Sequence, residues 1–283
     1  MFLRGYLFIV SALFSFHAAA QVVSNEPDAE QLKRDEWRRE IIGNRIDKPG
    51  KRNKFLQAPG GPALYYTMVG NMKVPFIVYV PKSYNPAKPT SLVVYLHNDP
   101  LIRETFQPLN PIVEEQPIFS IVDTFNTIVL FPFAKQDFVW VSDINVFNNI
   151  FAQIKLTEEY YNINKNRVYI GGQGQGGIAT YWFIMHAPDI FAGFYTFSAV
   201  FKEPVPINLS NITKEKPLYT LNTKDDKIMD YIRVQQIYEQ NKTIAPGWHF
   251  EIIDTGGHRF IFNKNGTRYV KSLIGELLEA TNK

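Results

Sequence analysis

A glycine-rich turn lies between a buried apolar run and a helix-like stretch at residues 167–180, RVYIGGQGQGGIAT. Strand, tight turn and helix in this order serve two chemistries. Gly172, Gly174 and Gly177 match G-x-G-x-x-G, in which glycines let a pyrophosphate approach a helix N-terminus. The frame from Gly172 to Gly176 also matches the nucleophile elbow G-x-S-x-G, except that Gly174 stands where the serine would be.

The elbow is the better interpretation of this turn. A lone glycine pattern is a weak sign of dinucleotide binding. Here it also comes more than halfway along a chain of 283 residues, after several predicted strands. We therefore favour the elbow over a nucleotide site.

Short β-branched and aromatic runs alternate with helix-like segments on both sides of the turn. The expected strands are 74–80, 92–96, 127–131, 167–170, 193–200, 217–221 and 250–253, and the expected helices are 143–160, 178–186, 229–240 and 269–280. This alternation predicts an α/β fold with a mostly parallel central sheet and helices on both faces. Gly60-Gly61-Pro62 predicts a turn before the first strand.

Taken in order, these motifs resemble secreted esterases of the α/β-hydrolase type, a group that includes feruloyl and acetylxylan esterases, polyhydroxybutyrate depolymerases and predicted carboxylesterases. The resemblance runs from about Val74 to the C-terminus. Its marks are VPFIVYVP at 74–81, a strand ending at His97, Trp140, NINKNRVY at 162–169 before the turn, and HAPDIF at 186–191.

The resemblance implies an α/β-hydrolase fold and a Ser-His-Asp type of site. It places the acid after a strand at Asp225, with Asp226 as a neighbour that the sequence does not exclude. It places the histidine at His258, in the Gly256-Gly257-His258 loop before the last helix. The chain order of elbow, acid and histidine agrees with that of α/β-hydrolases.

Two departures from the family pattern bear on function. Gly174 has no side chain, so no acyl-enzyme can form on it. After His97, where the family places glycines whose N–H groups face an oxyanion, this chain has Asn98-Asp99-Pro100. Pro100 has no N–H, and Asp99 opposes an oxyanion if it points inward.

What remains is a pocket suited to binding. We expect oxyanion or ligand contacts from Asn98 and from the N–H groups of Gln175 and Gly176 at a helix N-terminus. Aromatic candidates for the pocket wall are Trp140, Tyr181, Trp182 and Phe260.

The sequence therefore predicts a catalytically inactive esterase homologue that retains a pocket for a small ester, acyl or carbohydrate-derived ligand. The alternative is a slow carboxylic-ester hydrolase in which His258 and Asp225 activate water directly. A third class, an assembly protein that contacts a partner through a charged N-terminal arm, has no positive motif.

Composition excludes several kinds of partner and site. With 30 Lys+Arg against 27 Asp+Glu, the chain lacks the excess of basic residues that nucleic-acid binding needs. With no cysteine, and with histidines that lack ligand spacing, we expect no metal and no cofactor.

The sequence predicts three segments: a signal peptide at residues 1–20, a charged arm at 21–60 and the hydrolase-like domain at 61–283. The mature protein is expected to be secreted or periplasmic, without a membrane span.

Overall fold

The computed structural model describes residues 60–99, 101–140, 142–201 and 208–282, together with residues 36, 39, 55 and 56. The predicted signal peptide at 1–20, most of the predicted arm at 21–60, and Pro100 lie outside the described residues.

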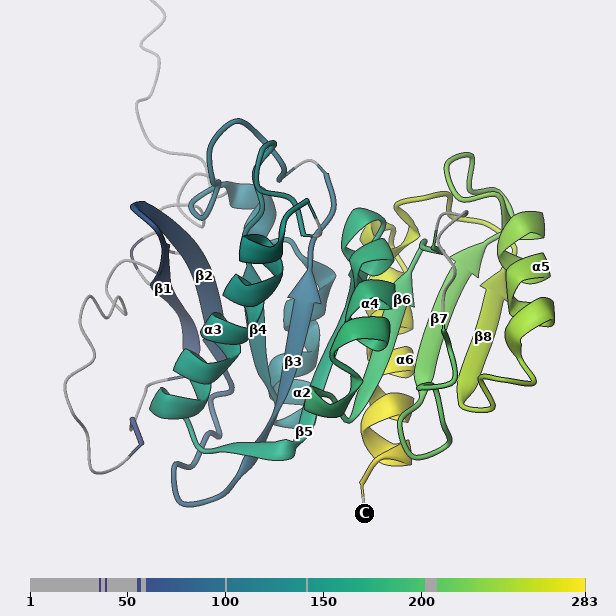
Figure 1. Cartoon of the computed structure of the whole chain (residues 1–283). Coiled ribbons are helices and arrows are strands. Elements are labelled where there is room, and N and C mark those ends of the chain that lie inside the picture. The colour runs from purple at the N-terminus through teal and green to yellow at the C-terminus, as the bar shows by residue number, and fades with distance from the viewer. Residues whose placement is uncertain are drawn as a thin grey trace, which may run out of the picture.

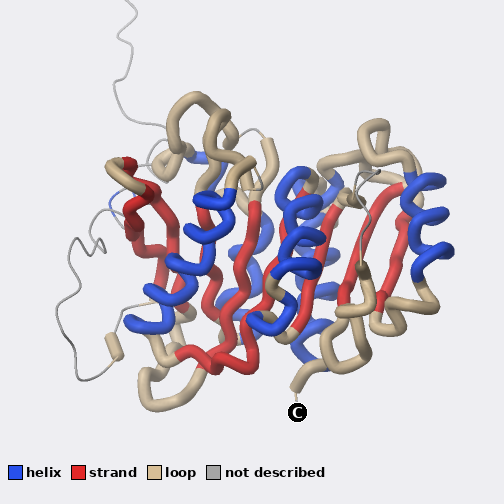
Figure 2. The backbone as a smooth tube through the Cα atoms, viewed as in Figure 1, coloured by secondary structure: helices blue, strands red, loops and turns tan. Residues whose placement is uncertain are grey.

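One eight-stranded sheet organises the described part of the chain (Figures 1 and 2). Its strands, in spatial order, are β1 (Gly61–Val69), β2 (Met72–Val80), β4 (Ile128–Pro132), β3 (Thr90–Leu96), β5 (Ile163–Gln173), β6 (Gly193–Phe197), β7 (Leu218–Thr223) and β8 (Trp248–Ile253). Strand β2 pairs antiparallel with both β1 and β4, and every pair from β4 to β8 is parallel. The predicted, mostly parallel sheet is confirmed.

Helices cover both faces of the sheet, as Figure 1 shows. On one face lie α3 (Ile144–Tyr160), α4 (Gln175–His186) and α5 (Tyr231–Asn241), and on the other lie α2 (Ile121–Phe125) and α6 (Gly266–Ala280). Each face has its own apolar core, because alternate residues of a strand point to opposite sides of the sheet. Phe194 of β6 packs into the core under α4 and α5, and the next residue, Tyr195, packs into the core under α6.

The first strand was missed at the sequence level. Gly61 and Pro62, expected in a turn, begin β1, which forms a hairpin with β2. Val69 pairs with Met72 across a two-residue loop in which Gly70 has φ 56°. A Gly-Asn dipeptide between two apolar runs is a hairpin signal, because such loops need a positive φ.

The parallel arrangement gathers the loops that could carry chemistry. In parallel strands the carboxyl ends lie at one edge of the sheet, and ligands bind outside that edge in open α/β sheets. The loops after β3, β5, β7 and β8 all leave from this edge, and they carry Asn98, Gly174, the pair Asp225 and Asp226, and His258.

Candidate functional site

The turn between β5 and α4 has the shape predicted for a nucleophile elbow. Strand β5 ends at Gln173, and α4 begins at Gln175. The single residue between them, Gly174, has φ 54° and ψ −115°. Its N–H donates to the carbonyl oxygen of Phe197 on the neighbouring strand β6, over 3.0 Å. The strand–turn–helix expected around Gly174 is therefore present, with no side chain at its apex.

The glycines beside Gly174 allow the elbow to pack closely on strand β3. A Cβ added to Gly172 would lie 2.2 Å from the carbonyl oxygen of Leu96, and one added to Gly176 would lie 1.9 Å from the same oxygen. These distances are shorter than any contact between nonbonded atoms, so only glycine fits at either position. Gly176 is therefore buried against Leu96 and does not line the pocket, whereas its neighbour Gln175 does.

His258 pairs with Asp226. The Nδ1 atom of His258 lies 3.0 Å from Oδ2 of Asp226, whose side chain is completely buried. The other oxygen, Oδ1, accepts the backbone N–H groups of Ile228 and Met229 over 2.8 and 2.9 Å. Three hydrogen bonds thus hold this carboxylate in place behind the imidazole.

Asp225, the first choice for the acid, does not contact His258, and the prediction is corrected on this point. Asp225 is exposed, and its two oxygens accept the N–H groups of Gly256 and Gly257 over 3.0 and 2.8 Å. These two hydrogen bonds lower the pKa of Asp225, because they stabilise the ionised form. The side chains of Asp225 and Asp226 point in different directions after β7. Asp225 therefore holds the loop that carries His258, and Asp226 orients the imidazole ring.

A buried amide completes the placement of His258. Gln173, the last residue of β5, donates from Nε2 to the backbone oxygen of His258 over 2.8 Å. Its side chain is 99% buried beneath the elbow. The sequence drew attention to Gln173 only as a residue that cannot be a nucleophile, and its role in positioning depends on a contact 85 residues away.

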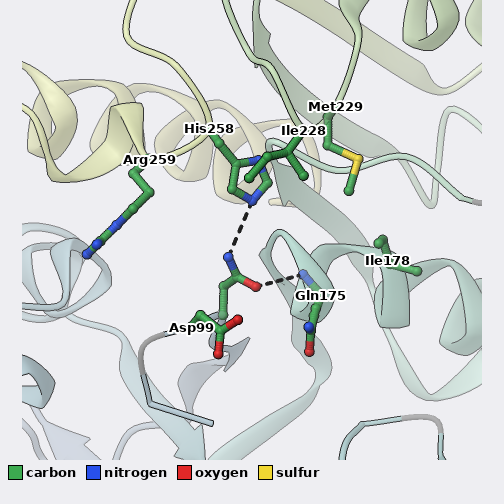
Figure 3. Close-up of a pocket in the computed structure, with 8 residues that line it drawn as sticks. Asp99, Gln175, Ile178, Ile228, Met229, His258 and Arg259 are labelled. Carbon is green, nitrogen blue, oxygen red and sulfur yellow. Dashed lines mark hydrogen bonds between the residues drawn. The ribbon is translucent and has the colours of Figure 1, made fainter.

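Asn98 hydrogen-bonds to both the elbow and His258, and Figure 3 marks these two bonds with dashed lines that end at the labelled Gln175 and His258. Its Oδ1 accepts the N–H of Gln175 over 3.2 Å, and its Nδ2 lies 3.3 Å from Nε2 of His258. A backbone N–H can only donate, so the amide oxygen faces Gln175 and the amide N–H₂ faces His258. Nε2 must then accept, and the ring proton sits on Nδ1, directed at Asp226.

The buried His97 anchors the loop that carries Asn98. Its Nδ1 is 3.1 Å from the backbone oxygen of Asn98, and its Nε2 accepts the N–H of Ala134 over 3.2 Å. Trp140 donates from Nε1 to the backbone oxygen of His97 over 2.9 Å. Burial lowers the pKa of His97 to about 4, since no solvent is available to stabilise the charged ring. His97 is a neutral structural residue beneath the site.

A pocket of about 570 Å³ opens above these groups (Figure 3). It is lined by Asn98, Asp99, Gln175, Ile178, Ile228, Met229, His258 and Arg259. None of these side chains is a hydroxyl or a thiol. Asp99 is exposed and lines the pocket. The sequence did not indicate the aliphatic wall of Ile178, Ile228 and Met229, because its three residues come from two separate segments.

None of the four aromatic candidates lines the main pocket, and the prediction is corrected on this point. Trp140, Tyr181 and Phe260 are each 1% exposed and belong to the apolar cores. Trp182 is 36% exposed and borders a second hollow of about 500 Å³ beside α3 and α4. Ser198, which follows β6, is fully buried with φ 47° and does not line the main pocket.

In the described part of the chain, no group of three or more His, Asp or Glu side chains is placed to hold a metal ion. Likewise, none of the helices described is both long and apolar enough to cross a membrane.

Comparison with known proteins identifies the fold. No protein-family model and no curated protein sequence matches the chain. Among solved structures it is similar to a thermostable esterase at 21% identity and a TM-score of 0.57, over 74% of this chain and 62% of that esterase. It is also similar to a feruloyl esterase module from Clostridium thermocellum (15%, TM-score 0.58, 81% of this chain and 93% of the module). Esterase 2 of Thermogutta terrifontis is a further neighbour (11%, TM-score 0.61, 78% and 95%).

The protein is thus an α/β-hydrolase in fold, and these structural neighbours are esterases. The expected fold class is confirmed.

Proposed function

We propose that this protein is a non-catalytic esterase homologue that binds a small ester, acyl or carbohydrate-derived ligand in the pocket above Gly174. The observation that carries the proposal is the elbow itself. Its backbone has the turn that presents a nucleophile, yet the apex residue has no side chain. No lining residue supplies a hydroxyl or thiol in its place, so acyl transfer through a covalent intermediate has no attacking atom.

The preserved parts of the site support a binding role. The pocket of about 570 Å³ is within the range of small-molecule sites, with an aliphatic wall and a few polar groups. Asp99 and Arg259 provide one charge of each sign at its border. A ligand with an apolar body and polar substituents, such as an ester or a sugar derivative, fits this combination.

Hydrolysis and binding assays test the proposal separately. We expect the purified wild-type protein to hydrolyse p-nitrophenyl acetate and butyrate no faster than a His258→Ala control. For binding, Ile178→Trp fills the pocket, whereas Ile244→Trp adds the same ring at a residue that is 51% exposed and lines neither hollow. Short esters and disaccharides should lose affinity only for Ile178→Trp. Wild-type turnover that disappears in His258→Ala would contradict the proposal.

One observation favours the alternative, direct activation of water. His258 and Asp226 form the pair that a general base needs, with 3.0 Å between Nδ1 and Oδ2. Against it, Nε2 already accepts a hydrogen bond from Asn98 and is not free to take a proton from water. Such a mechanism would give slow turnover without a covalent intermediate, so a His258-dependent rate with no trapped acyl group would identify it.

We further propose export through the signal peptide at 1–20 and a protein contact through the charged arm at 21–60. N-terminal sequencing of the protein from its host should find Gln21 first. Deletion of 21–60 should abolish complex formation and leave ligand binding unchanged if the arm contacts a partner.

A further inference from the structure

The amide of Asn98 occupies the volume that a side chain at the elbow apex would need. A Cβ added to Gly174 would lie 2.6 Å from both Cγ and Nδ2 of Asn98, and 2.8 Å from its Oδ1. All three distances are too short for nonbonded contact. A side chain at Gly174 therefore requires the amide of Asn98 to move aside, and that movement costs the amide its two hydrogen bonds.

The same amide also makes both polar contacts that an elbow normally reserves for the reaction. Its Oδ1 accepts the N–H of Gln175, the residue after the apex, which in an elbow faces the developing oxyanion. Its Nδ2 donates to Nε2 of His258, the atom to which a nucleophile hydroxyl would donate. The Oδ1 atom of Asn98 thus takes the place of a substrate's acyl oxygen, and its Nδ2 takes the place of the nucleophile hydroxyl.

Two buried side chains beneath the site, those of His97 and Trp140, hold the backbone of the loop that carries Asn98. The imidazole of His97 binds both the backbone oxygen of Asn98 and the N–H of Ala134, and Trp140 binds the backbone oxygen of His97. His97 and Trp140 are no more than 1% exposed. The core therefore fixes the backbone from which the amide extends, and the amide's own two hydrogen bonds set its direction.

We propose that Asn98 is a built-in occupant of the acyl site, a positioning residue that holds His258 in its Nδ1–H form and blocks the N–H of Gln175. This inference rests on the proposed function, since it assumes that the elbow has no nucleophile. Its consequence is a coupling between two positions: Gly174→Ser alone does not restore a nucleophile, and Asn98→Ala/Gly174→Ser does.

A fluorophosphonate probe measures the coupling. In labelling, the introduced hydroxyl oxygen bonds to phosphorus, fluoride leaves, and the hydroxyl proton passes to Nε2 of His258. We expect the double variant to be labelled about 100-fold faster than Gly174→Ser, because in the single variant Asn98 still competes with the new side chain for the space at the apex and for the N–H of Gln175. Addition of His258→Ala to the double variant should abolish labelling. The matched control is Asn166→Ala/Gly174→Ser, which changes an exposed asparagine in β5, far along the strand from the elbow.

The outcomes separate this inference from the proposed function. Labelling of the wild-type chain contradicts the proposed function, whereas the ratio between the single and double variants decides the coupling. Equal labelling of Gly174→Ser and the double variant overturns the coupling, as does a folded double variant that stays unlabelled. If Gly174→Ser fails to fold while the double variant folds, the steric conflict is supported directly.

A second measurement needs no change at Gly174. The ¹⁵N NMR signal of Nε2 in His258 reports its hydrogen bonding, and Asn98→Ala removes the donor that it faces. We expect this signal to move in Asn98→Ala and to stay unchanged in Asn166→Ala. The same Nε2 signal in wild type and Asn98→Ala would overturn the role given to Asn98.

Discussion

Replacing Asp226 by asparagine should disturb a directional chain of hydrogen bonds. In the wild type, Gln175 donates to Asn98, Asn98 donates to His258, and His258 donates to Asp226. Asp226→Asn keeps the shape and can keep the bonds from Ile228 and Met229 to Oδ1. It then places an N–H₂ group against the Nδ1–H of His258, so that two donors face each other.

Reversing the direction of these hydrogen bonds does not remove this conflict. If the His258 proton moves to Nε2, it meets the N–H₂ of Asn98, and a flipped Asn98 presents N–H₂ to the N–H of Gln175. One donor therefore remains without a protein acceptor at whichever link the conflict falls. It costs about 1–3 kcal/mol at the buried link beside Asp226 and less at the exposed N–H of Gln175. The two backbone bonds to Oδ1 also weaken by about 1 kcal/mol each when the acceptor loses its charge. Relief of carboxylate burial offsets part of this loss. We expect a net destabilisation of about 1–3 kcal/mol.

Urea unfolding gives the magnitude, and imidazole ¹⁵N NMR gives the tautomer of His258. Asp225→Asn is the matched control, because it neutralises the adjacent carboxylate, which is exposed and does not touch the ring. We expect the ring proton of His258 to leave Nδ1 only in Asp226→Asn. If Asp226→Asn is as stable as the wild type and its His258 keeps the Nδ1–H form, the directional chain described above is wrong.

The remaining predictions concern pH. Two backbone N–H groups lower the pKa of Asp225 below its usual 3.8, so its contribution to stability is complete above pH 3.8 and is lost as the pH falls through the lower folded value. The stability difference between wild type and Asp225→Asn, from urea unfolding, should therefore shrink below pH 3.8 and not between pH 5 and 8. Burial lowers the pKa of His97 from 6.5 to about 4, so the unfolded chain takes up a proton before the folded one. Between pH 6.5 and 4 the wild type should lose about 3 kcal/mol that His97→Gln does not lose, and a flat wild-type profile there would contradict the neutral, buried His97.

Local patterns were sufficient for most of the fold. The strands and helices around the elbow could be predicted from periodicity, because the pattern of apolar residues within a segment shows which of its faces are buried. Strand β1 was missed because Gly61 and Pro62 signal a turn when they are considered alone. Its pairing with β2 is a contact that the Gly70-Asn71 loop marks only when both flanking runs are considered together.

For the site, the sequence by itself determined which residue types are present. Gly174 at an elbow apex, His258 in a glycine loop and two adjacent carboxylates after β7 could all be identified, because each stands in a short local motif. The absence of a nucleophile at Gly174 was equally plain, since a missing side chain needs no geometry to interpret.

Only the tertiary structure decided which of these groups meet. It paired His258 with Asp226 and left Asp225 to hold the loop, a choice that depends on the direction of each side chain as it leaves β7. It also brought Asn98 into the space above Gly174, from a strand end 76 residues earlier in the chain. Hydrogen-bond direction and excluded volume act between atoms a few ångströms apart, and that proximity is created by the sheet, which places the ends of β3, β5, β7 and β8 at one edge.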